Sequence, residues 1–398
     1  MVKKLASVQR STQAVVNLGA IGYNVSQIRK RIGERRDLMA VVKADGYGHG
    51  AVPVSLAALR AGANCLGVAF PEEGALLRNA GIEAPILVLG LIQPEEACKV
   101  VDFRLEQTIC SLKLAEALDQ VARSASVRVN IHVKVDTGMN RIGINPKDAL
   151  AFIRKIRRFK NLHLLGIFSH FSCADEVEKS FAKKQVEIFN AMVREVDYAG
   201  IPIPKKHLAN SAAILDLPES YYDLVRPGIM IYGLYPSAEV SRSIKLRPAM
   251  TLKTRVAYVK SVPGEVPVSY GRTFYTRKST RIATLPVGYA DGYSRLMSNQ
   301  GAVLVKGRRA PVIGRVCMDM CMIDVSGIKN VKTGDEAILF GEELSADEVA
   351  HKIGTISYEV VCAIGKRVPR IYVDESTFEK GGTRGQEFSS LSVQDRKY

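Results

Sequence analysis

Lys43 is the residue in this sequence that most directly suggests covalent chemistry. It follows the run DLMAVV and precedes ADGYGHG, so glycines, a tyrosine and a histidine come directly after it. Residues 37–42 are typical of a short buried strand, because they are mostly apolar and bounded by breakers. The end of such a strand, where a parallel sheet meets its loops, is the usual place for catalytic groups in α/β folds. An uncharged lysine amine there could form a Schiff base with a carbonyl compound.

Pyridoxal 5′-phosphate (PLP) is the commonest protein-bound partner of such a lysine, and it needs a phosphate cradle and a group facing its ring nitrogen. In a barrel the cradle comes from the late strand-to-helix loops and a helix N-terminus. Ser211 in HLANSAAIL would open a helix with free N–H groups. In VRPGIMIYG, Gly228 and Ile229 would present further N–H groups, and Arg226 could lie beneath the cofactor. A serine after an asparagine is also an ordinary helix cap, so these residues indicate a site only in combination.

The elements that must position these groups follow a regular rhythm up to about residue 235. The apolar runs that indicate strands are LMAVVK, CLGVAF, PILVLGL, RLEQTIC, RVNIHVKV, HLLGIFSHF, KKHLAN and LVRPGIMIYG. Helical patterns such as GAVPVSLAALRAGA, SLKLAEALDQVARS and EKSFAKKQVEIFNAMVREVDYAG separate most of them. Strands that alternate with helices in this way predict an α/β fold, a (β/α)8 or TIM barrel. A doubly wound sheet is the alternative interpretation.

After about residue 240 the pattern changes to strands separated by turn residues. AMTLKTRVAYVKSV, TRIATLPVG, AVLVKGRRAPVIGRV, CMIDVS and DEAILFG are strand-like. SADEVAHKIG is the clear helix, with Ser345 as its expected N-cap and Glu348 three residues later. We therefore expect a PLP-binding barrel domain at residues 1–240 and a mostly β C-terminal domain at residues 241–380. The polar segment 381–398 is expected to be a flexible tail.

The composition indicates a globular protein and narrows its class. The chain has 398 residues, of which 47% are hydrophobic and 24% charged. It contains no apolar stretch of the roughly 20 residues that a membrane span requires. The basic N-terminus precedes no apolar segment of the signal-peptide type, and the seven cysteines are scattered. These features predict a cytoplasmic protein that does not bind membranes.

The net charge of +16 raises the question of nucleic-acid binding. The basic residues are spread over several segments, such as RKRIGERR and RKIRRFKN, and no zinc-finger or RNA-binding signature accompanies them. We therefore expect no nucleic-acid partner, and some attraction of anionic ligands. Cys317 and Cys321 are four residues apart, but no second pair of metal ligands lies nearby, so no metal site is predicted.

Together these segments resemble the bacterial PLP-dependent alanine racemases, from about residue 12 to residue 375. VVKADGYGHG resembles the family's PLP-lysine signature at essentially every position. HVKVDTGMNRIG, SHFSCAD, HLANSAAIL, RPGIMIYG, VSYGRTF, PVGYADGY, GRVCMDMCMIDV and SYEV then follow in the family's order. Short motifs such as DTGM or RPG mean little alone, but the ordered series is specific.

The resemblance implies a role for each matching residue. Lys43 would be the Schiff-base lysine, and Tyr270 would be the second catalytic base. The other cofactor-binding positions, which hold the phosphate, face the pyridine nitrogen or lie beside the cofactor, are Tyr47, His170, Asn210, Ser211, Arg226, Gly228, Ile229 and Tyr358. The substrate-binding positions are Arg141, Tyr289, Met318 and Asp319, and those lining the entrance are Arg295, Arg315 and Ile356. Lys134 matches a position where some family members carry a carbamylated lysine that faces Arg141.

The resemblance also implies a reaction and an assembly. The expected reaction interconverts L-alanine and D-alanine and supplies D-alanine for peptidoglycan. Racemisation removes the α-proton from one face of the carbon and returns a proton to the other, so it needs an acid/base on each face. Lys43 and Tyr270 would be this pair, in a homodimer whose partner subunit contributes Tyr270, Tyr289, Met318 and Asp319 to each site.

Three other interpretations remain open on the sequence. A related PLP racemase could act on a broader or different range of amino acids, such as serine. A non-catalytic PLP-binding protein would resemble the barrel alone, and this chain continues with a second domain. A PLP-dependent decarboxylase could use a similar barrel, but VSYGRTF would then have no role.

Overall fold

The computed structural model describes residues 10–374, and the chain divides into two compact units. One unit is Ile21–Arg247, and the other combines the residues up to Ala20 with those from Pro248 onwards. The boundary predicted from the sequence lies at residues 240/241, with the N-terminal residues in the barrel domain. The segment 381–398, expected to be a flexible tail, lies outside the described residues. Between residues 10 and 374, no helix combines the length and the apolar character that crossing a membrane requires.

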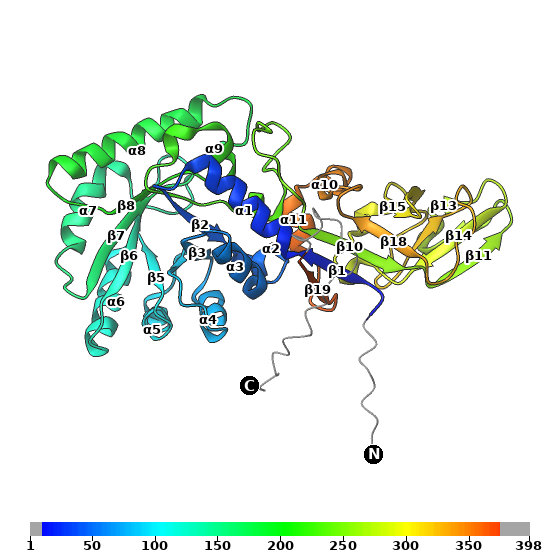
Figure 1. Cartoon of the computed structure of the whole chain (residues 1–398), viewed down its shortest axis with the longest axis horizontal. Coiled ribbons are helices and arrows are strands. Elements are labelled where there is room, and N and C mark those ends of the chain that lie inside the picture. The colour runs from blue at the N-terminus through cyan, green and yellow to red at the C-terminus, as the bar shows by residue number, and fades with distance from the viewer. Residues whose placement is uncertain (1–9, 375–398) are drawn as a thin grey trace, which may run out of the picture. The chain divides into compact units, whose positions relative to one another are not determined.

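The unit Ile21–Arg247 is built on an eight-stranded parallel sheet with the order β8-β7-β6-β5-β4-β3-β2-β9 (Figure 1). Its strands are β2 Asp37–Val41, β3 Cys65–Val68, β4 Ile86–Val88, β5 Glu106–Ile109, β6 Val129–Lys134, β7 Leu162–Phe168, β8 Lys205–His207 and β9 Leu224–Val225. Backbone hydrogen bonds from Asp223 to Lys206 (3.0 Å) and from Arg226 to Ala209 (2.9 Å) nearly close the barrel. The predicted TIM-type barrel is therefore confirmed, with strands in all eight expected runs, and the doubly wound sheet is wrong.

Helices connect these strands and lie outside the sheet (Figure 1). They are α1 Leu18–Ile32, which runs into this unit, α3 Ala51–Arg60, α4 Pro71–Asn79, α5 Ala97–Asp102, α6 Leu112–Ser124, α7 Ala149–Ile156, α8 Ser180–Tyr198 and α9 Ser211–Asp216. The short 3₁₀ turns are η1 Pro94–Glu96, η2 Pro146–Asp148, η3 Pro218–Ser220 and η4 Ile229–Tyr232. In α8, Ala182, Val186, Phe189 and Val196 are buried at helical spacing, which gives the helix an apolar face for the core.

The other unit is mostly β, as predicted. A six-stranded sheet has the order β16-β15-β18-β10-β1-β19, and β11-β14-β17 and β12-β13 form smaller sheets. The strands are β1 Gln13–Asn17, β10 Met250–Arg255, β11 Tyr258–Val262, β12 Pro267–Val268, β13 Phe274–Tyr275, β14 Thr280–Leu285, β15 Ala302–Val305, β16 Arg308–Pro311, β17 Cys321–Asp324, β18 Glu336–Phe340 and β19 Arg370–Val373. The helices are α10 Ala346–Ile353 and α11 Ser357–Cys362, with 3₁₀ turns η5 Tyr270–Arg272, η6 Tyr289–Asp291 and η7 Arg295–Met297. The predicted cap of α10 is confirmed, because Ser345 Oγ accepts a hydrogen bond from the Glu348 N–H at 3.0 Å.

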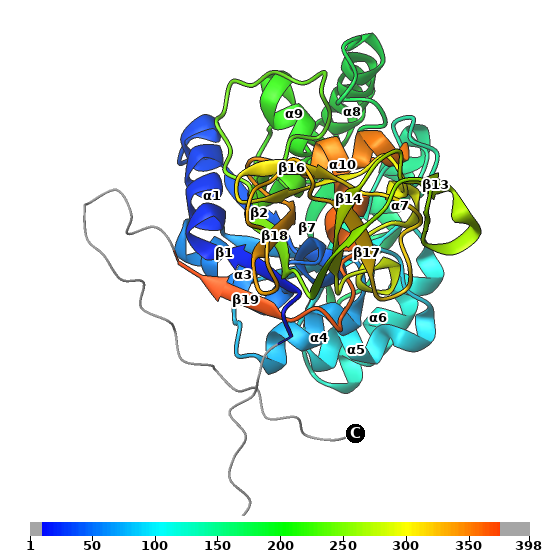
Figure 2. The same ribbon diagram turned by 90° about the vertical axis from the view of Figure 1, so that its right-hand side faces the viewer.

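Strand β1 was not anticipated from the sequence. It pairs antiparallel with β10, with Ala14 opposite Leu252, and parallel with β19, with Val15 opposite Ile371. β1 and β19 lie side by side in Figure 2. Ala14 and Val16 are fully buried, so alternate residues of β1 face the core of this sheet. The N-terminal segment thus completes the β sheet instead of adding to the barrel.

Candidate active site

The carboxyl ends of parallel strands lie at one end of a barrel, and the predicted barrel residues gather there. Lys43 follows β2, Lys134 ends β6, His170 follows β7, Asn210 and Ser211 follow β8, and Arg226, Gly228 and Ile229 follow β9. Tyr47 ends the short segment that starts at Lys43, and Arg141 lies in the loop after β6. The topology thus brings together groups that are far apart in the sequence.

The segment after β2, α2 Lys43–Tyr47, has a left-handed backbone. The φ angles are 53° at Ala44, 52° at Asp45, 59° at Gly46 and 52° at Tyr47. Residues with a Cβ rarely adopt this conformation, which costs about 1–3 kcal/mol each and persists only where the surroundings impose it. Such strain directly after Lys43 is typical of a functional site.

Two carboxylates that sequence analysis missed hold this segment. Glu73 accepts a hydrogen bond from the Ala44 N–H at Oε1 (2.7 Å) and one from the Ala69 N–H at Oε2 (2.7 Å). Asp45 Oδ1 accepts a hydrogen bond from the Ala51 N–H at 2.8 Å. The carboxylates therefore satisfy backbone N–H groups on both sides of this left-handed segment, and they fix the position of the backbone after Lys43.

A second group of residues forms a small cradle of donors. The Gly228 N–H donates to Ser211 Oγ at 2.9 Å. A Cβ on Gly228 would lie 2.5 Å from the Tyr47 hydroxyl oxygen, so only glycine lets that hydroxyl come so close. The N–H groups of Ser211 and of the fully buried Ile229 form no hydrogen bond with any described residue. Buried N–H groups without partners beside hydroxyls suit an anion such as a phosphate.

Asn210 has a structural role beside this cradle. Its Oδ1 accepts a hydrogen bond from the Ala213 N–H at 3.0 Å and so caps α9. The ordinary interpretation of an asparagine before a serine, a helix cap, therefore applies here. The cap also orients Ser211, the first residue of the helix.

Arg226 is a buried cation at the centre of the barrel end. It is 4% exposed, and it donates hydrogen bonds to the carbonyl oxygens of Ser169 (2.8 Å) and Leu208 (3.1 Å). It also donates to Nδ1 of His207 (2.8 Å) and to Nδ1 of His170 (3.3 Å). Burial lowers the pKa of Arg226 to about 9, so the guanidinium stays charged at neutral pH. No carboxylate within residues 10–374 forms an ion pair with it.

Lys134 lies close to this arginine. It is 4% exposed, and its Nζ lies 4.5 Å from the centre of the Phe168 ring. Burial lowers the pKa of Lys134 well below its ordinary value, and the charges of Arg226 and Arg141 lower it further. The chemistry available here is that of an uncharged, nucleophilic amine in a cationic surrounding.

His170 is held neutral in the same surrounding. Burial lowers its pKa well below the ordinary value, and the charges of Lys134 and Arg226 add to this effect. Because Nδ1 accepts the hydrogen bond from Arg226, the proton of the neutral ring is on Nε2. Lys43 also contributes to the positive potential at His170.

The remaining predicted residues belong to the β unit, and most of them are exposed. Tyr270 is 70% exposed, Met318 52% and Tyr289 42%. Asp319 accepts a hydrogen bond from Arg367 Nη2 at 2.7 Å, and Tyr358 lies half-buried in α11. Of the expected entrance residues, Arg295 and Ile356 are exposed and Arg315 is half-buried.

Within the β unit, short contacts order these loops. The Tyr289 N–H donates to the Cys317 carbonyl at 3.0 Å, which ties η6 to the segment that carries Met318. The Ser269 hydroxyl donates to the Arg315 carbonyl at 2.6 Å, directly before Tyr270. The φ angles are 67° at Ser269 and 68° at Gly271, so the backbone on both sides of Tyr270 is left-handed. Tyr270 thus sits in a strained turn, as Lys43 does.

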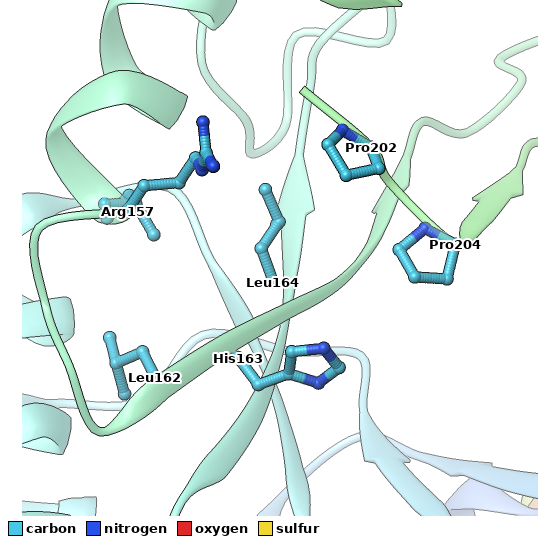
Figure 3. Close-up of a pocket in the computed structure, with 7 residues that line it drawn as sticks. Arg157, Leu162, His163, Leu164, Pro202 and Pro204 are labelled. Atoms are coloured by element: carbon cyan, nitrogen blue, oxygen red, sulfur yellow. The ribbon is translucent and has the colours of Figure 1, made fainter. Parts of the chain in front are cut away.

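A surface hollow of about 280 Å³ lies at the opposite end of the barrel (Figure 3). It is lined by Ile156, Arg157, Leu162, His163, Leu164, Pro202 and Pro204. Leu162 is the first residue of β7, so the hollow lies at the amino end of the strands. None of the predicted site residues lines it.

Comparisons with known proteins match both units. Residues 16–236 match the family described as the alanine racemase N-terminal domain, and residues 249–372 match the alanine racemase C-terminal domain. An alanine racemase of Desulfovibrio desulfuricans is 48% identical over 371 residues, which cover 93% of this chain and 100% of that protein.

Solved structures agree with the sequence matches. The alanine racemase of Clostridium difficile has a TM-score of 0.89 and 39% identity, over 93% of this chain and 97% of that chain. The alanine racemase of Bacillus anthracis with bound L-Ala-P has a TM-score of 0.87 and 38% identity, again over 93% and 97%. The likeness therefore extends over nearly the full length of both chains in each pair.

Proposed function

The chain belongs to the alanine racemase family, and we propose that it is a PLP-dependent enzyme that interconverts L-alanine and D-alanine. The observation that carries the proposal is the barrel end, where a lysine after β2, an anion cradle and a buried arginine occur together. Each of these is common alone. Their combination on a barrel of this family suits a phosphorylated cofactor that is bound covalently through a lysine.

The residues of the barrel end fit PLP. The N–H groups of Ser211 and Ile229 and the hydroxyl of Tyr47 would hold its phosphate, and Tyr358 would add a further hydroxyl. Lys43 would carry the cofactor, and Arg226 would face its ring nitrogen. When bound, PLP would stabilise the negative charge that develops on the α-carbon of the substrate.

Arg226 would limit how strongly the cofactor withdraws electrons. A guanidinium is a poor proton donor, so it would leave the ring nitrogen unprotonated. Its hydrogen bonds to two carbonyl oxygens and two imidazoles fix its plane and leave little freedom to rearrange. A weaker electron sink would suppress side reactions such as transamination and favour simple return of the proton.

Lys43 and Tyr270 would move the α-proton. Racemisation needs one acid/base on each face of the α-carbon, and these side chains would serve the two faces. Arg141 would bind the substrate carboxylate as a bidentate cation. The side chains lining the substrate pocket near the α-carbon would be Tyr289, Met318 and Tyr358. They would leave room for a methyl side chain and so favour alanine.

We further propose that the enzyme is a homodimer with shared active sites. Tyr270, Tyr289 and Met318 are between 42% and 70% exposed, together with the neighbouring Met320 at 51%. A group of exposed tyrosines and methionines is typical of a surface that another chain covers. In such a dimer, Tyr270, Tyr289, Met318 and Asp319 of one subunit would complete the site that contains Lys43 of the other.

Lys134 is proposed to be carbamylated. Its lowered pKa favours the free amine, which can attack dissolved CO₂ and release one proton to give the anionic carbamate. The carbamate would neutralise part of the positive charge and orient Arg141 through charge-assisted hydrogen bonds. Mass spectrometry after exposure to ¹³C-bicarbonate and chemical trapping of the carbamate should label Lys134, and a Lys134→Met variant should show no label at this site. An unlabelled Lys134 peptide would contradict the carbamate.

The function is tested with purified protein and added PLP. We expect conversion of L-alanine into D-alanine until both are equally abundant, and borohydride reduction should fix the cofactor to Lys43 in the peptide map. L-Serine, assayed beside L-alanine, tests the alternative of a broader or different racemase, and comparable turnover would favour it. A protein that binds no PLP, or binds it without racemising either amino acid, would refute the proposal. We place the activity in the cytoplasm, where D-alanine would be supplied for peptidoglycan.

A further inference from the structure

A chain of hydrogen bonds crosses the barrel interior from Arg226 to the amino end of β5. Arg226 Nη1 donates to His207 Nδ1 at 2.8 Å. His207 Nε2 lies 2.9 Å from His132 Nδ1, and His132 Nε2 lies 3.1 Å from Glu106 Oε2. His132 and His207 are at most 1% exposed. HVKVDTGMNRIG begins at His132 and HLANSAAIL begins at His207, but no role was assigned to these histidines or to Glu106, because the three residues lie on three different strands.

The chemistry of the donors sets the direction of this chain. A guanidinium can only donate, so His207 Nδ1 must accept and the neutral ring carries its proton on Nε2. That proton points to His132 Nδ1, which must accept in turn. The proton of His132 is therefore on Nε2 and is donated to the carboxylate of Glu106. Both histidines are neutral in this arrangement, and every hydrogen bond points from Arg226 towards Glu106.

The strand between the two histidines is shaped to let them meet. β7 lies between β6, which carries His132, and β8, which carries His207. The residue of β7 opposite His132 is Gly166, and the register shifts by one residue at this point. A Cβ on Gly166 would lie 2.2 Å from His132 Nδ1, the atom that accepts from His207. Any other residue at position 166 would block the bond, so the fold makes room for it.

We propose that Glu106 is a positioning residue for Arg226, which it supports from the far end of the barrel through His132 and His207. Arg226 is a buried cation whose direct partners are all neutral. Glu106 is the carboxylate that its hydrogen bonds reach, and polarisation along the two imidazoles conveys part of that negative charge. Assigning the effect to catalysis rests on the proposed function, in which Arg226 faces the ring nitrogen of PLP.

The surroundings of Glu106 keep it ionised. Burial acts to raise the pKa of Glu106, but the hydrogen bonds from His132 and Asn130 and the charge of Lys205 together hold it below its usual value. The bond from Asn130 Nδ2 to Glu106 Oε1 is 3.1 Å long. Asn130 Oδ1 lies 2.9 Å from Nδ1 of His163, a residue of the surface hollow in Figure 3. The anionic end of the chain therefore lies close to solvent, whereas the cationic end is buried.

Several cations lie near the histidines of this chain. Burial lowers the pKa of His207 well below its ordinary value, and the charges of Arg226, Lys134 and Lys205 contribute. Lys205 forms an ion pair with Asp37 at 2.8 Å. A positive charge on either imidazole would be repelled by these cations, which agrees with two neutral rings.

The tautomers provide the first test. The chain has six histidines, so ¹⁵N labelling of this residue type gives a spectrum that single substitutions can assign. In the PLP-loaded protein at neutral pH, we expect His132 and His207 each to carry one proton, on Nε2. A doubly protonated His132, or a proton on Nδ1 of either ring, would overturn the proposal. The same spectrum of the cofactor-free protein is informative even if the proposed function fails.

Variants provide the second test. Glu106→Gln keeps the size and removes the charge, and we expect kcat to fall about tenfold with KM little changed, as for other outer-shell partners. The Nε2–H resonance of His207 should shift in the same variant, although Glu106 does not touch this ring. Glu83→Gln is the matched control, because Glu83 is an exposed carboxylate that pairs with Arg104, and neither readout should change.

Gly166→Ala interrupts the chain without changing any of its polar groups. It should remove the bond between His132 and His207 and reproduce the loss in kcat. If Glu106→Gln behaves like the Glu83→Gln control in both readouts, the proposal is refuted. If the Glu106 or Gly166 variants do not fold, the tautomers of the unmodified protein still decide it.

Discussion

The barrel end that carries Lys43 and the loops of the β unit that carry Tyr270 differ most in burial. Both residues lie beside left-handed backbone, at Ala44–Tyr47 after Lys43 and at Ser269, Gly271 and Arg272 around Tyr270. At the barrel end Lys134, Ser211 and Arg226 are buried and Lys43 is half-buried, although Arg141 is exposed, and Arg226 alone donates four hydrogen bonds. In the β unit the side chain of Tyr270 is 70% exposed. A single chain therefore fixes the first region, whereas the side chain of Tyr270 in the second is largely exposed in a single chain, as the proposed dimer requires.

This difference suggests a division of labour. A group that binds and tunes a cofactor must be held in one position, and burial in a barrel provides this. A base that approaches the other face of the substrate can come from a surface that assembles around it. The two-base proposal thus requires both regions, and it can be tested by substituting residues in each region separately.

The largest expected effect is on racemase activity, when one acid/base is removed from each of the two regions and the two variants are then mixed. Lys43→Ala and Tyr270→Phe should each lower racemase activity by about 10³-fold or more, because each removes one of the two acid/bases. If the bases come from different subunits, co-refolding the two variants gives heterodimers with one intact site. A random mixture should then recover about a quarter of the unmodified activity, because half of the symmetric dimers become mixed.

The recovery separates the two possible arrangements. If both bases belonged to the same chain, every site in the mixture would still carry one lesion and no activity would return. Native mass spectrometry confirms that heterodimers have formed. Heterodimers without activity would mean that Tyr270 acts within its own subunit or is not a base.

Much of the barrel end could be predicted because its determinants are local. The run DLMAVV followed by lysine and glycine indicates a buried strand and its loop, and β2 and the left-handed segment are found there. In the β unit, likewise, the spacing of Ser345 to Glu348 predicts a helix cap, and the hydrogen bond is present. In both cases a few neighbouring residues determine the outcome.

The rest could not be predicted because it depends on contacts between distant segments. Strand β1 is short, and only its pairing with β10 and β19 reveals that it belongs to the β sheet. Glu73 holds the backbone at Ala44, a residue 29 positions away, and no local pattern indicates this. The link between His132 and His207 spans 75 positions and depends on Gly166 between them.

A smaller effect is expected on the stability of the barrel. Arg226→Leu leaves the carbonyls of Ser169 and Leu208 and the ring nitrogen of His207 without their donor, so we expect the free energy of unfolding to fall by about 3 kcal/mol. Arg309→Leu is the control in the β unit, where the arginine pairs with Glu348 at the surface. Its effect should stay below about 1 kcal/mol in urea unfolding. Equal losses in both variants would contradict the contrast between a buried and an exposed region.

The pH dependence of stability should also distinguish the barrel end. The pKa values of His170 and His207 are lowered, first by burial and then by neighbouring cations, so the unfolded chain binds protons that the folded chain does not. Stability is therefore complete above about pH 6.5 and falls below it, by about 1.4 kcal/mol per pH unit for each histidine until its folded pKa is reached. Urea unfolding between pH 7 and pH 5 measures this slope. His170→Asn should remove one histidine's share, and an unchanged slope would show that His170 is not held neutral.

The smallest effect is expected where the β unit is exposed. Tyr270→Phe removes a hydroxyl from a side chain that is 70% exposed, so the free energy of unfolding should change by less than about 0.5 kcal/mol, even though activity collapses. Tyr293→Phe is the matched substitution in the same unit, where the ring is 2% exposed and its hydroxyl has no hydrogen-bond partner among the described residues. Removing that hydroxyl relieves a desolvation penalty, so we expect a gain in stability of about 1 kcal/mol with activity retained. A Tyr270→Phe protein destabilised by more than 1 kcal/mol would mean that this side chain supports the fold, and its loss of activity could then no longer be assigned to a missing base.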